Sequence, residues 1–244
     1  MKYSAAIICI ISLLTFKRGE TQEIIKEGIF VYETVLKLEH PMQSEEESES
    51  RKKKKKQLIA FNEQLLRIVD STPTSEQIKL LNCNSNENYQ FVNNGSSFYQ
   101  MPYKATDFFD FRAMGLIPPT IEYKDDEKKL INGFICKKAI FSLNLSAADR
   151  FNMEVWYCPD YKVEANCFNY YFKELKGIPV MFTFKNTKGP SVAGSTVIST
   201  TEYLLTRFST SKLDKSFNSI ANREKYRLVG AEQMMEVAME ISKW

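Results

Sequence analysis

The sequence predicts a mainly β (α+β) fold: an antiparallel sheet with one early helix and one C-terminal helix packed against it. Residues 28–38 alternate between apolar and polar positions, the pattern of a half-buried strand. Further runs between residues 129 and 184 also have strand character, and residues 196–208 are rich in β-branched side chains. With 244 residues, of which 43% are hydrophobic, the chain is long enough for one domain with a substantial core.

The first strand has two distinct faces. Phe30, Tyr32 and Thr34 fall on one face, whereas Glu33 and Lys37 fall on the other. Because successive side chains of a strand point to opposite sides, the first set is expected to face the core.

A charged segment follows this strand. An acidic run at residues 45–49 stands directly before a lysine run at residues 52–56. Such blocks of charge cannot be packed in a core, so they predict a solvated loop at about residues 42–57, with the polar start of a helix as the alternative.

The next segment has helical spacing. Its apolar residues are Leu58, Phe61, Leu65, Ile68 and Val69, and a proline at position 73 follows. This spacing predicts an amphipathic helix that ends before the proline and packs on the sheet. A helix lying on a membrane surface is the alternative, because lysines precede it, but the acidic run beside them would weaken attraction to anionic lipid.

Shorter strands are expected after the helix. Residues 77–91 contain two strand-like runs around an asparagine-rich turn, and Asn94-Gly95 marks a second turn. Residues 107–120 are aromatic and irregular and contain two consecutive prolines.

The strand-like runs of the second half are KLINGFICKKAIFSL, MEVWYCPDY and LKGIPVMFTF, each interpreted as one strand. The long strand at residues 196–208 follows them. Met234, Val237, Ala238 and Ile241 then define an apolar stripe, which predicts the C-terminal helix.

The N-terminus has the organisation of a secretory signal. Lys2 precedes an apolar run at residues 5–16, which is shorter than the roughly 20 residues that cross a bilayer. We therefore expect a signal peptide at residues 1–21, a single domain at residues 22–244, and a periplasmic or secreted protein. An uncleaved, buried N-terminal helix is the alternative, because the segment after the apolar run contains no A-x-A-like cleavage site.

Cysteine and histidine usage limits the chemistry. Without Cys9 of the N-terminal segment, the cysteines are Cys83, Cys136, Cys158 and Cys167, which permit disulfides in three different pairings. None of the spacings is C-x-x-C, and His40 is the only histidine, so no metal site is expected.

No catalytic constellation is recognisable, and we expect neither an enzyme nor a cofactor. The single histidine stands beside a proline and a charged segment, with no nucleophile motif near it. The adjacent acids Asp125 and Asp126 are flanked by lysines, where solvation is the usual state. Because the two signs of charge nearly balance, to a net +3, nucleic acid is not an expected partner.

From about Gly28 to the C-terminus the chain resembles a domain family of Bacteroidetes envelope proteins, the GLPGLI family, and a sister family related to the lipoprotein-carrier (LolA-like) fold; the specific motifs cover about a quarter of the chain. In that pattern a GykCkkA strand is followed by a tryptophan strand and then by a strand with Gly, a hydrophobic residue and Pro. The third motif has the sequence LKGIPV here. The positions that carry the resemblance are Gly133, Cys136, Lys137, Lys138, Ala139, Trp156, Tyr157, Pro159, Leu175, Gly177, Ile178, Pro179 and Val180.

The resemblance implies a strongly curved antiparallel sheet, half-closed around an apolar groove, with helices against its mouth. A concave apolar face that is only partly filled leaves room for an acyl chain. The candidates for the groove lining are Phe134, Trp156, Phe182 and Phe184. An aromatic content of 13% suits such a lining, and it suits an ordinary β core equally well.

Two functional hypotheses follow, ahead of a third, an uncharacterised enzyme, which no catalytic constellation supports. The first is a non-enzymatic envelope protein that binds a hydrophobic ligand, such as a lipid or a lipidated partner, in the half-barrel. The second is a structural or interaction module whose core is filled by its own side chains and whose surface docks to another envelope protein.

Overall fold

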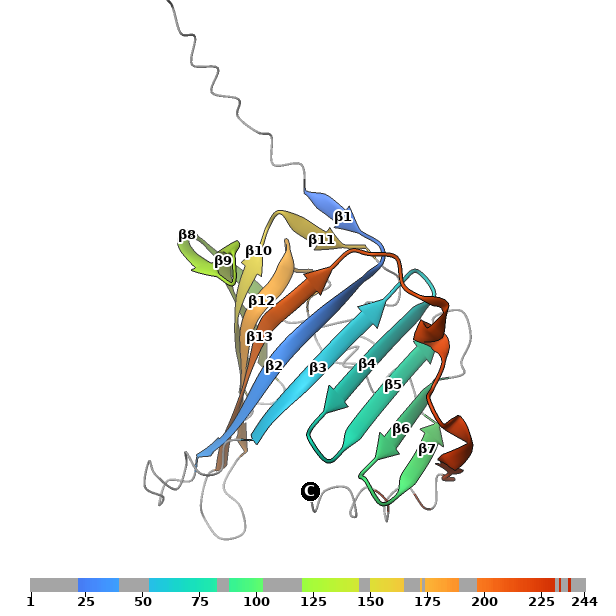
Figure 1. Ribbon diagram of the computed structural model, residues 1–244. Helices are drawn as coiled ribbons and strands as arrows, with labels where there is room; N and C mark the ends of the chain where they lie inside the picture. The colour runs from blue at the N-terminus through green and yellow to red at the C-terminus, as the bar shows by residue number, and fades with distance from the viewer. Residues whose placement is uncertain are drawn as a thin grey trace, which may run out of the picture.

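The computed structural model describes residues 22–39, 53–82, 88–102, 120–144, 150–164, 172, 174–188, 197–230, 233 and 237. The mainly β fold is confirmed, and one large curved sheet dominates these residues (Figure 1). The strands, in chain order, are β1 (Glu23–Ile25), β2 (Gly28–Glu39), β3 (Lys53–Phe61), β4 (Leu65–Ser71), β5 (Glu76–Asn82), β6 (Tyr89–Asn93), β7 (Phe98–Pro102), β8 (Thr120–Ile131), β9 (Phe134–Asn144), β10 (Arg150–Cys158), β11 (Tyr161–Val163), β12 (Ile178–Lys188), β13 (Val197–Ser209) and β14 (Arg227–Leu228).

The large sheet has twelve strands in the order β14-β7-β6-β5-β4-β3-β2-β13-β12-β10-β9-β8. All neighbours in it are antiparallel except β14 and β7. The pairing of β13 with β2 joins the meander β2–β7 to the meander of the second half. Because β14 and β8 are both edge strands, the sheet is open. Strands β1 and β11 form a separate parallel pair.

The faces predicted for the first strand are confirmed. Phe30, Tyr32 and Thr34 of β2 are buried, and Glu33 is exposed. The strands predicted within residues 77–91 correspond to β5 and β6, the turn at Asn94-Gly95 precedes β7, and the long strand predicted at residues 196–208 is β13.

The predicted early helix is wrong, because residues 53–71 form the hairpin of β3 and β4. The chain turns at residues 62–64, where the Asn62 side-chain carbonyl accepts hydrogen bonds from the backbone N–H groups of Gln64 and Leu65, at 2.9 and 2.8 Å. Pairing with β2 explains why this segment is a strand. Ile59 lies opposite Phe30 in the ladder, so the apolar face of β3 is buried beside that of β2.

The predicted extent of the charged loop is also too long. Strand β3 begins at Lys53, and Lys54, Lys55 and Lys56 are exposed strand residues in register with β2. Lysine is compatible with a strand where its side chain reaches water. Residues 40–52, including His40, lie outside the described residues.

The run KLINGFICKKAIFSL is two strands rather than one. Strand β8 ends at Ile131, and Asn132 and Gly133 form a tight turn with φ values of 48° and 84° before β9 begins. These positive φ values are those of a type I′ turn, for which Asn-Gly is the favoured dipeptide. Strand β8 itself carries six consecutive exposed residues, 125–130, and forms an edge of the sheet.

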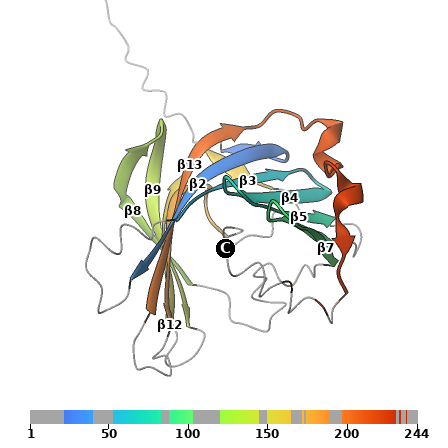
Figure 2. The same cartoon turned by 60° about the horizontal axis from the view of Figure 1, so that its bottom comes forward.

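The sheet curls so strongly that residues three strands apart come into contact. Asn132 Nδ2 at the β8–β9 turn donates a hydrogen bond of 2.7 Å to the Leu205 carbonyl of β13. The Phe134 ring lies 6.1 Å from the Phe208 ring, which in turn lies 5.3 Å from Phe30. The face that carries Phe30 and Tyr32 is therefore the concave one, and Figure 2 shows the arch that results.

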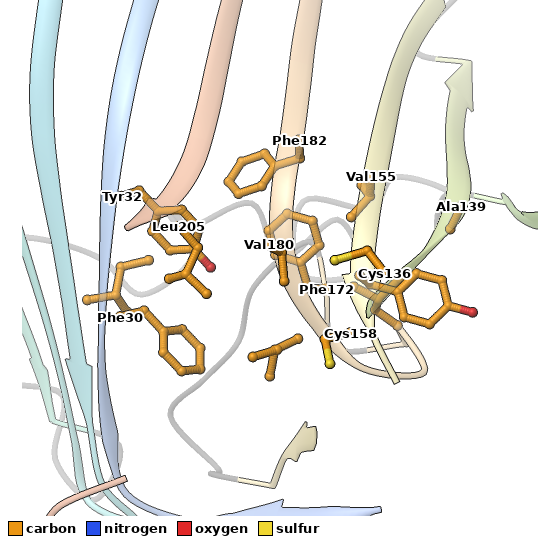
Figure 3. Close-up of a cluster of buried hydrophobic side chains, with 14 of the residues drawn as sticks. Phe30, Tyr32, Cys136, Ala139, Val155, Cys158, Phe172, Val180, Phe182 and Leu205 are labelled. Atoms are coloured by element: carbon orange, nitrogen blue, oxygen red, sulfur yellow. The ribbon is translucent and has the colours of Figure 1, made fainter. Parts of the chain in front are cut away.

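The main core contains residues from every strand between β5 and β8 in the sheet order, and Figure 3 shows part of it. Phe30, Val155 and Val180 of the sheet are buried there, and Phe172 packs on them from the segment between β11 and β12. A second, smaller cluster lies at the other end of the sheet. Its members are Val92, Met101, Val229 and Val237, with Tyr99 packed against them.

The segment after β13 crosses the opposite, convex face. It contains the short 3₁₀ helices Lys215–Asn218 and Arg223–Lys225. Arg67 Nη1 donates to the carbonyls of Phe217 and Ser219 at 2.9 and 2.8 Å, which fixes this segment to β4. Of the apolar stripe of the predicted C-terminal helix only Val237 is described, and the predicted signal peptide lies outside the described residues. In the part of the chain that the structure describes, no helix has the length and apolarity needed to cross a membrane.

Candidate functional site

Two of the four predicted groove residues come together on β12. Phe182 is buried, with 3% of its surface exposed, and its ring stacks on Tyr203 at 4.4 Å with 9° between the planes. Phe184 is half-buried and lies 5.8 Å from each of Phe182 and Tyr203. We call Phe182, Phe184 and Tyr203 the aromatic ledge. It forms the border of the main core, because Phe172 and Tyr32 pack on Phe182 at 4.8 and 5.5 Å.

The other two candidates lie elsewhere. Phe134 contacts Tyr161 and Phe208 beside the β8–β9 turn, at 6.4 and 6.1 Å. Trp156 alternates along β10 with the fully buried Val155 and therefore points to the other face.

Trp156 is surrounded by charged groups. The ammonium groups of Lys129 and Lys138 each lie 5.6 Å from its ring centroid, and its indole N–H donates to Glu154 Oε1 at 3.1 Å. Lys138 also forms ion pairs with Glu127 and Glu154, at 3.2 and 3.1 Å. This is a half-buried, cation-flanked tryptophan on the surface and not part of the aromatic ledge.

A row of polar side chains continues from the core across the concave face. Tyr32 of β2 stands in register with Gln57 of β3, Gln57 with Asp70 of β4, and Asp70 with Gln77 of β5. In-register neighbours point to the same face, so Gln57, Asp70 and Gln77 lie side by side. We call these three residues the amide row. Gln57 Nε2 donates to Asp70 Oδ1 at 2.8 Å.

The amide row ends at the second cluster, because Gln77 pairs with Val92. All three residues of the row are half-buried. The concave face thus presents hydrogen-bonding groups between two apolar regions, one of which ends in the aromatic ledge. Such an arrangement suits an amphipathic molecule, with an apolar body on the ledge and a polar group over the row.

Burial sets the electrostatics of this region. Burial, with a smaller contribution from the negative charge of Asp70, raises the pKa of Tyr203 to about 12. Burial also raises the pKa of Tyr32, whose hydroxyl donates to the Pro179 carbonyl at 2.8 Å. Both phenols are therefore neutral hydrogen-bond donors at ordinary pH.

Cys136 and Cys158 are free thiols, and both are buried. Burial raises the pKa of Cys136 to about 12 and that of Cys158 to about 11, so neither is a reactive thiolate near neutral pH. Cys83 and Cys167 lie outside the described residues, and disulfide formation among the four cysteines stays a prediction.

The two buried cysteine thiols predict that the protein loses stability at alkaline pH. The thiols of Cys136 and Cys158 ionise near pH 9 in the unfolded chain but only at about 12 and 11 in the folded protein. Between pH 9 and these values the unfolded state binds fewer protons than the folded state, so the free energy of unfolding falls as the pH rises. We expect the urea midpoint to decrease steadily between pH 8.5 and pH 11, with each thiol contributing about 1 kcal/mol or more.

The control for this prediction is the double variant Cys136→Ala/Cys158→Ala. Its urea midpoint should depend less steeply on pH over the same range, although buried tyrosines still contribute. A wild-type midpoint that is constant between pH 8.5 and pH 11 would contradict the prediction.

No group of three or more histidine, cysteine or acidic side chains suited to a metal ion occurs among the described residues. The predictions that the protein holds no metal or cofactor and is not an enzyme stay predictions.

No family model matches the chain, and a search of curated proteins gives no significant match. Among solved structures, one that matches is a putative outer membrane lipoprotein-sorting protein domain from Vibrio parahaemolyticus. Its identity is 9%, the match covers 79% of this chain and 89% of that one, and the TM-score is 0.30. A likeness at this level carries no argument about ligand or activity.

Proposed function

We propose that this protein is a non-enzymatic, exported envelope protein that binds an amphipathic ligand on its concave face. The ligand class is a lipid or the acyl chain of a lipidated partner. The observation that carries the proposal is the half-buried edge of the aromatic ledge, Phe184 and Tyr203, next to the amide row.

The chemistry of the two parts is complementary. An acyl chain against the ledge removes apolar surface from water, at about 25 cal/mol per Å². The amide row offers both donors and acceptors for a polar head group, since Gln57 and Gln77 carry NH₂ and carbonyl groups and Asp70 carries a carboxylate. A purely apolar ligand would displace water from the amide row without replacing the hydrogen bonds that its side chains make to water. This cost favours a ligand with a polar end.

The test combines co-purification with a probe. The protein is isolated from the periplasm, analysed by native mass spectrometry and extracted with organic solvent for lipid analysis. It is then titrated with a dansylated fatty acid. We expect a co-purifying lipid or acylated peptide, and a Kd for the probe that rises at least tenfold in Phe184→Ser, because about 1.5–3 kcal/mol of apolar contact is lost.

The matched control is Trp156→Ser, which removes a half-buried aromatic side chain from the other face. This variant should retain the wild-type Kd within about twofold. If Trp156→Ser weakens the probe and Phe184→Ser does not, the proposed site is wrong. A clean apo mass together with no probe uptake would rule out the ligand-binding function.

A second candidate function is an interaction module with a self-filled core. The observation in its favour is that Phe172 and Leu175, from the segment before β12, are buried against the concave face, with Phe172 6.0 Å from Phe141 and 4.8 Å from Phe182. Side chains of the chain itself therefore occupy part of the space that a half-barrel would offer to a guest. An apo protein that captures no lipid would favour this candidate.

A further inference from the structure

We infer that the tip of the β8–β9 hairpin is a docking site for an anionic lipid bilayer. This inference concerns a surface separate from the concave face and does not depend on the ligand proposed above. Among the large hydrophobic side chains of the described residues, Leu130 is 71% exposed and Ile135 is 62% exposed.

These two side chains form one apolar knob. Leu130 is the partner of Ile135 in the β8–β9 ladder, one pair away from the Asn132-Gly133 turn. Directly opposite residues of an antiparallel pair lie on the same face with their Cβ atoms about 5 Å apart. The tip of the hairpin therefore presents a contiguous apolar surface to solvent.

Basic side chains stand directly behind the knob on the same face. Lys128 and Lys137, two residues from Leu130 and Ile135 on their strands, are themselves opposite each other in register. Two like charges in directly opposed positions destabilise a strand pair. Among the described residues a carboxylate is paired with only one of these two lysines, that of Asp125 at 3.9 Å from Lys137 Nζ. An anionic surface would compensate both lysines, at about 1 kcal/mol per lysine near charged lipid.

Contacts on the inner side of the hairpin attach the turn that carries the knob to β11 and β13. The Asn132 side chain is bonded to the Leu205 carbonyl at 2.7 Å, and Phe134 packs on Tyr161 and Phe208 on the inner side of the turn. Tyr161 belongs to β11, which pairs with β1, so the tip lies at the same end of the molecule as β1 (Figure 1). Ile24 of β1, 43% exposed, adds an apolar side chain at this end.

Size and edge geometry favour a bilayer over a protein partner. A stable protein interface buries about 800 Å² on each partner, which two side chains cannot supply. Strand β8 is an edge strand, but its ladder with β9 is interrupted between Lys124 and Lys128, and such a bulge hinders addition of another strand. Two apolar side chains at the tip, with two lysines behind them, instead suit a shallow insertion of the tip between anionic lipid headgroups.

The test is co-sedimentation of the full chain with vesicles of phosphatidylcholine alone and of phosphatidylcholine with 30% phosphatidylglycerol. We expect the partition coefficient to be at least tenfold higher on the anionic vesicles, and to fall when the salt concentration rises to 0.5 M. The variant Leu130→Ser/Ile135→Ser should lose at least tenfold of this binding, and Lys128→Gln/Lys137→Gln should bind anionic vesicles less and depend less on salt.

The matched control is Leu228→Ser, which removes a side chain that is 66% exposed on β14, at the opposite edge of the sheet. It carries the same N-terminal segment as the tip variant and should bind like the wild type within twofold. Absence of vesicle binding, or equal binding by the wild type and the tip variant, would overturn the inference. So would a dimer that the tip substitutions convert to a monomer in light scattering, because the tip would then contact a second copy.

Discussion

Replacement of Phe182 by alanine is expected to lower the free energy of unfolding by about 3–5 kcal/mol. Phe182 is 3% exposed, stacks on Tyr203 at 4.4 Å and contacts Tyr32 and Phe172 at 5.5 and 4.8 Å. The truncation removes transfer free energy and leaves a cavity that neighbours on two strands and one connecting segment cannot all fill. Equilibrium urea unfolding followed by circular dichroism measures the loss.

The neighbouring variant Phe184→Ala is the control for this prediction. Phe184 points to the same face of β12 but is only half-buried, so its truncation should cost less than about 2 kcal/mol. A Phe182→Ala protein as stable as the wild type, with a lost affinity for the fatty-acid probe, would assign Phe182 to an open groove. The expected pattern instead makes Phe182 a core residue and leaves Phe184 as the residue that a ligand touches.

The extent of β structure could be predicted because several strands bury one face only. In β2 the alternation of Phe30, Glu33 and Thr34 gives a clear period of two, and β13 combines β-branched residues with a long uninterrupted run. Neither prediction depended on knowing the partner strand. The register that joins β2 to β13 and closes the two meanders into one sheet is a long-range property, which local patterns do not contain.

The early helix failed because its apolar positions fit two periods. Leu58, Phe61, Leu65 and Ile68 are spaced as on a helix, but Ile59, Phe61, Leu66 and Ile68 also alternate on two strands separated by a polar turn. The deciding contact is with β2, which is distant in sequence. The one local signal for the hairpin was the polar triplet at residues 62–64, whose Asn62 side chain bonds the turn.

Strand β8 was missed for a different reason. As an exposed edge strand it carries acidic and basic side chains along most of its length, so no apolar alternation marks it. The Asn132-Gly133 dipeptide was the available signal, since it is the favoured sequence of a two-residue hairpin turn. Recognition of this turn would have predicted two strands at residues 120–144.

The candidate site was predictable only in part. Large aromatic residues on β12 marked the region of the ledge, but whether each one is core, border or surface depends on which segments pack over it. The amide row could not be predicted at all. Gln57, Asp70 and Gln77 become neighbours only through the register of three strands, two of which the sequence placed in a charged loop and a helix.

Replacement of Gly177 by alanine is expected to destabilise the protein by about 3 kcal/mol or more, which corresponds to a fall of about 10 °C in Tm. Gly177 is buried just before β12, and a Cβ atom there would lie 2.2 Å from the Cys158 carbonyl oxygen and 2.7 Å from Tyr157 Cδ2. The nearest atom belongs to the backbone of β10, so the clash can be relieved only by a displacement of β12 that weakens the core around Val180.

Gly230→Ala is the matched control for Gly177→Ala, because a Cβ atom at position 230 meets nothing within 4 Å. This variant should unfold within about 1 °C of the wild type, while Gly177→Ala unfolds far earlier in the same calorimetric scan. Equal Tm values for the two variants would show that β12 does not approach β10 as closely as described. Gly177 belongs to the sequence LKGIPV, and the close crossing of the two backbones is a physical reason for a glycine at that position.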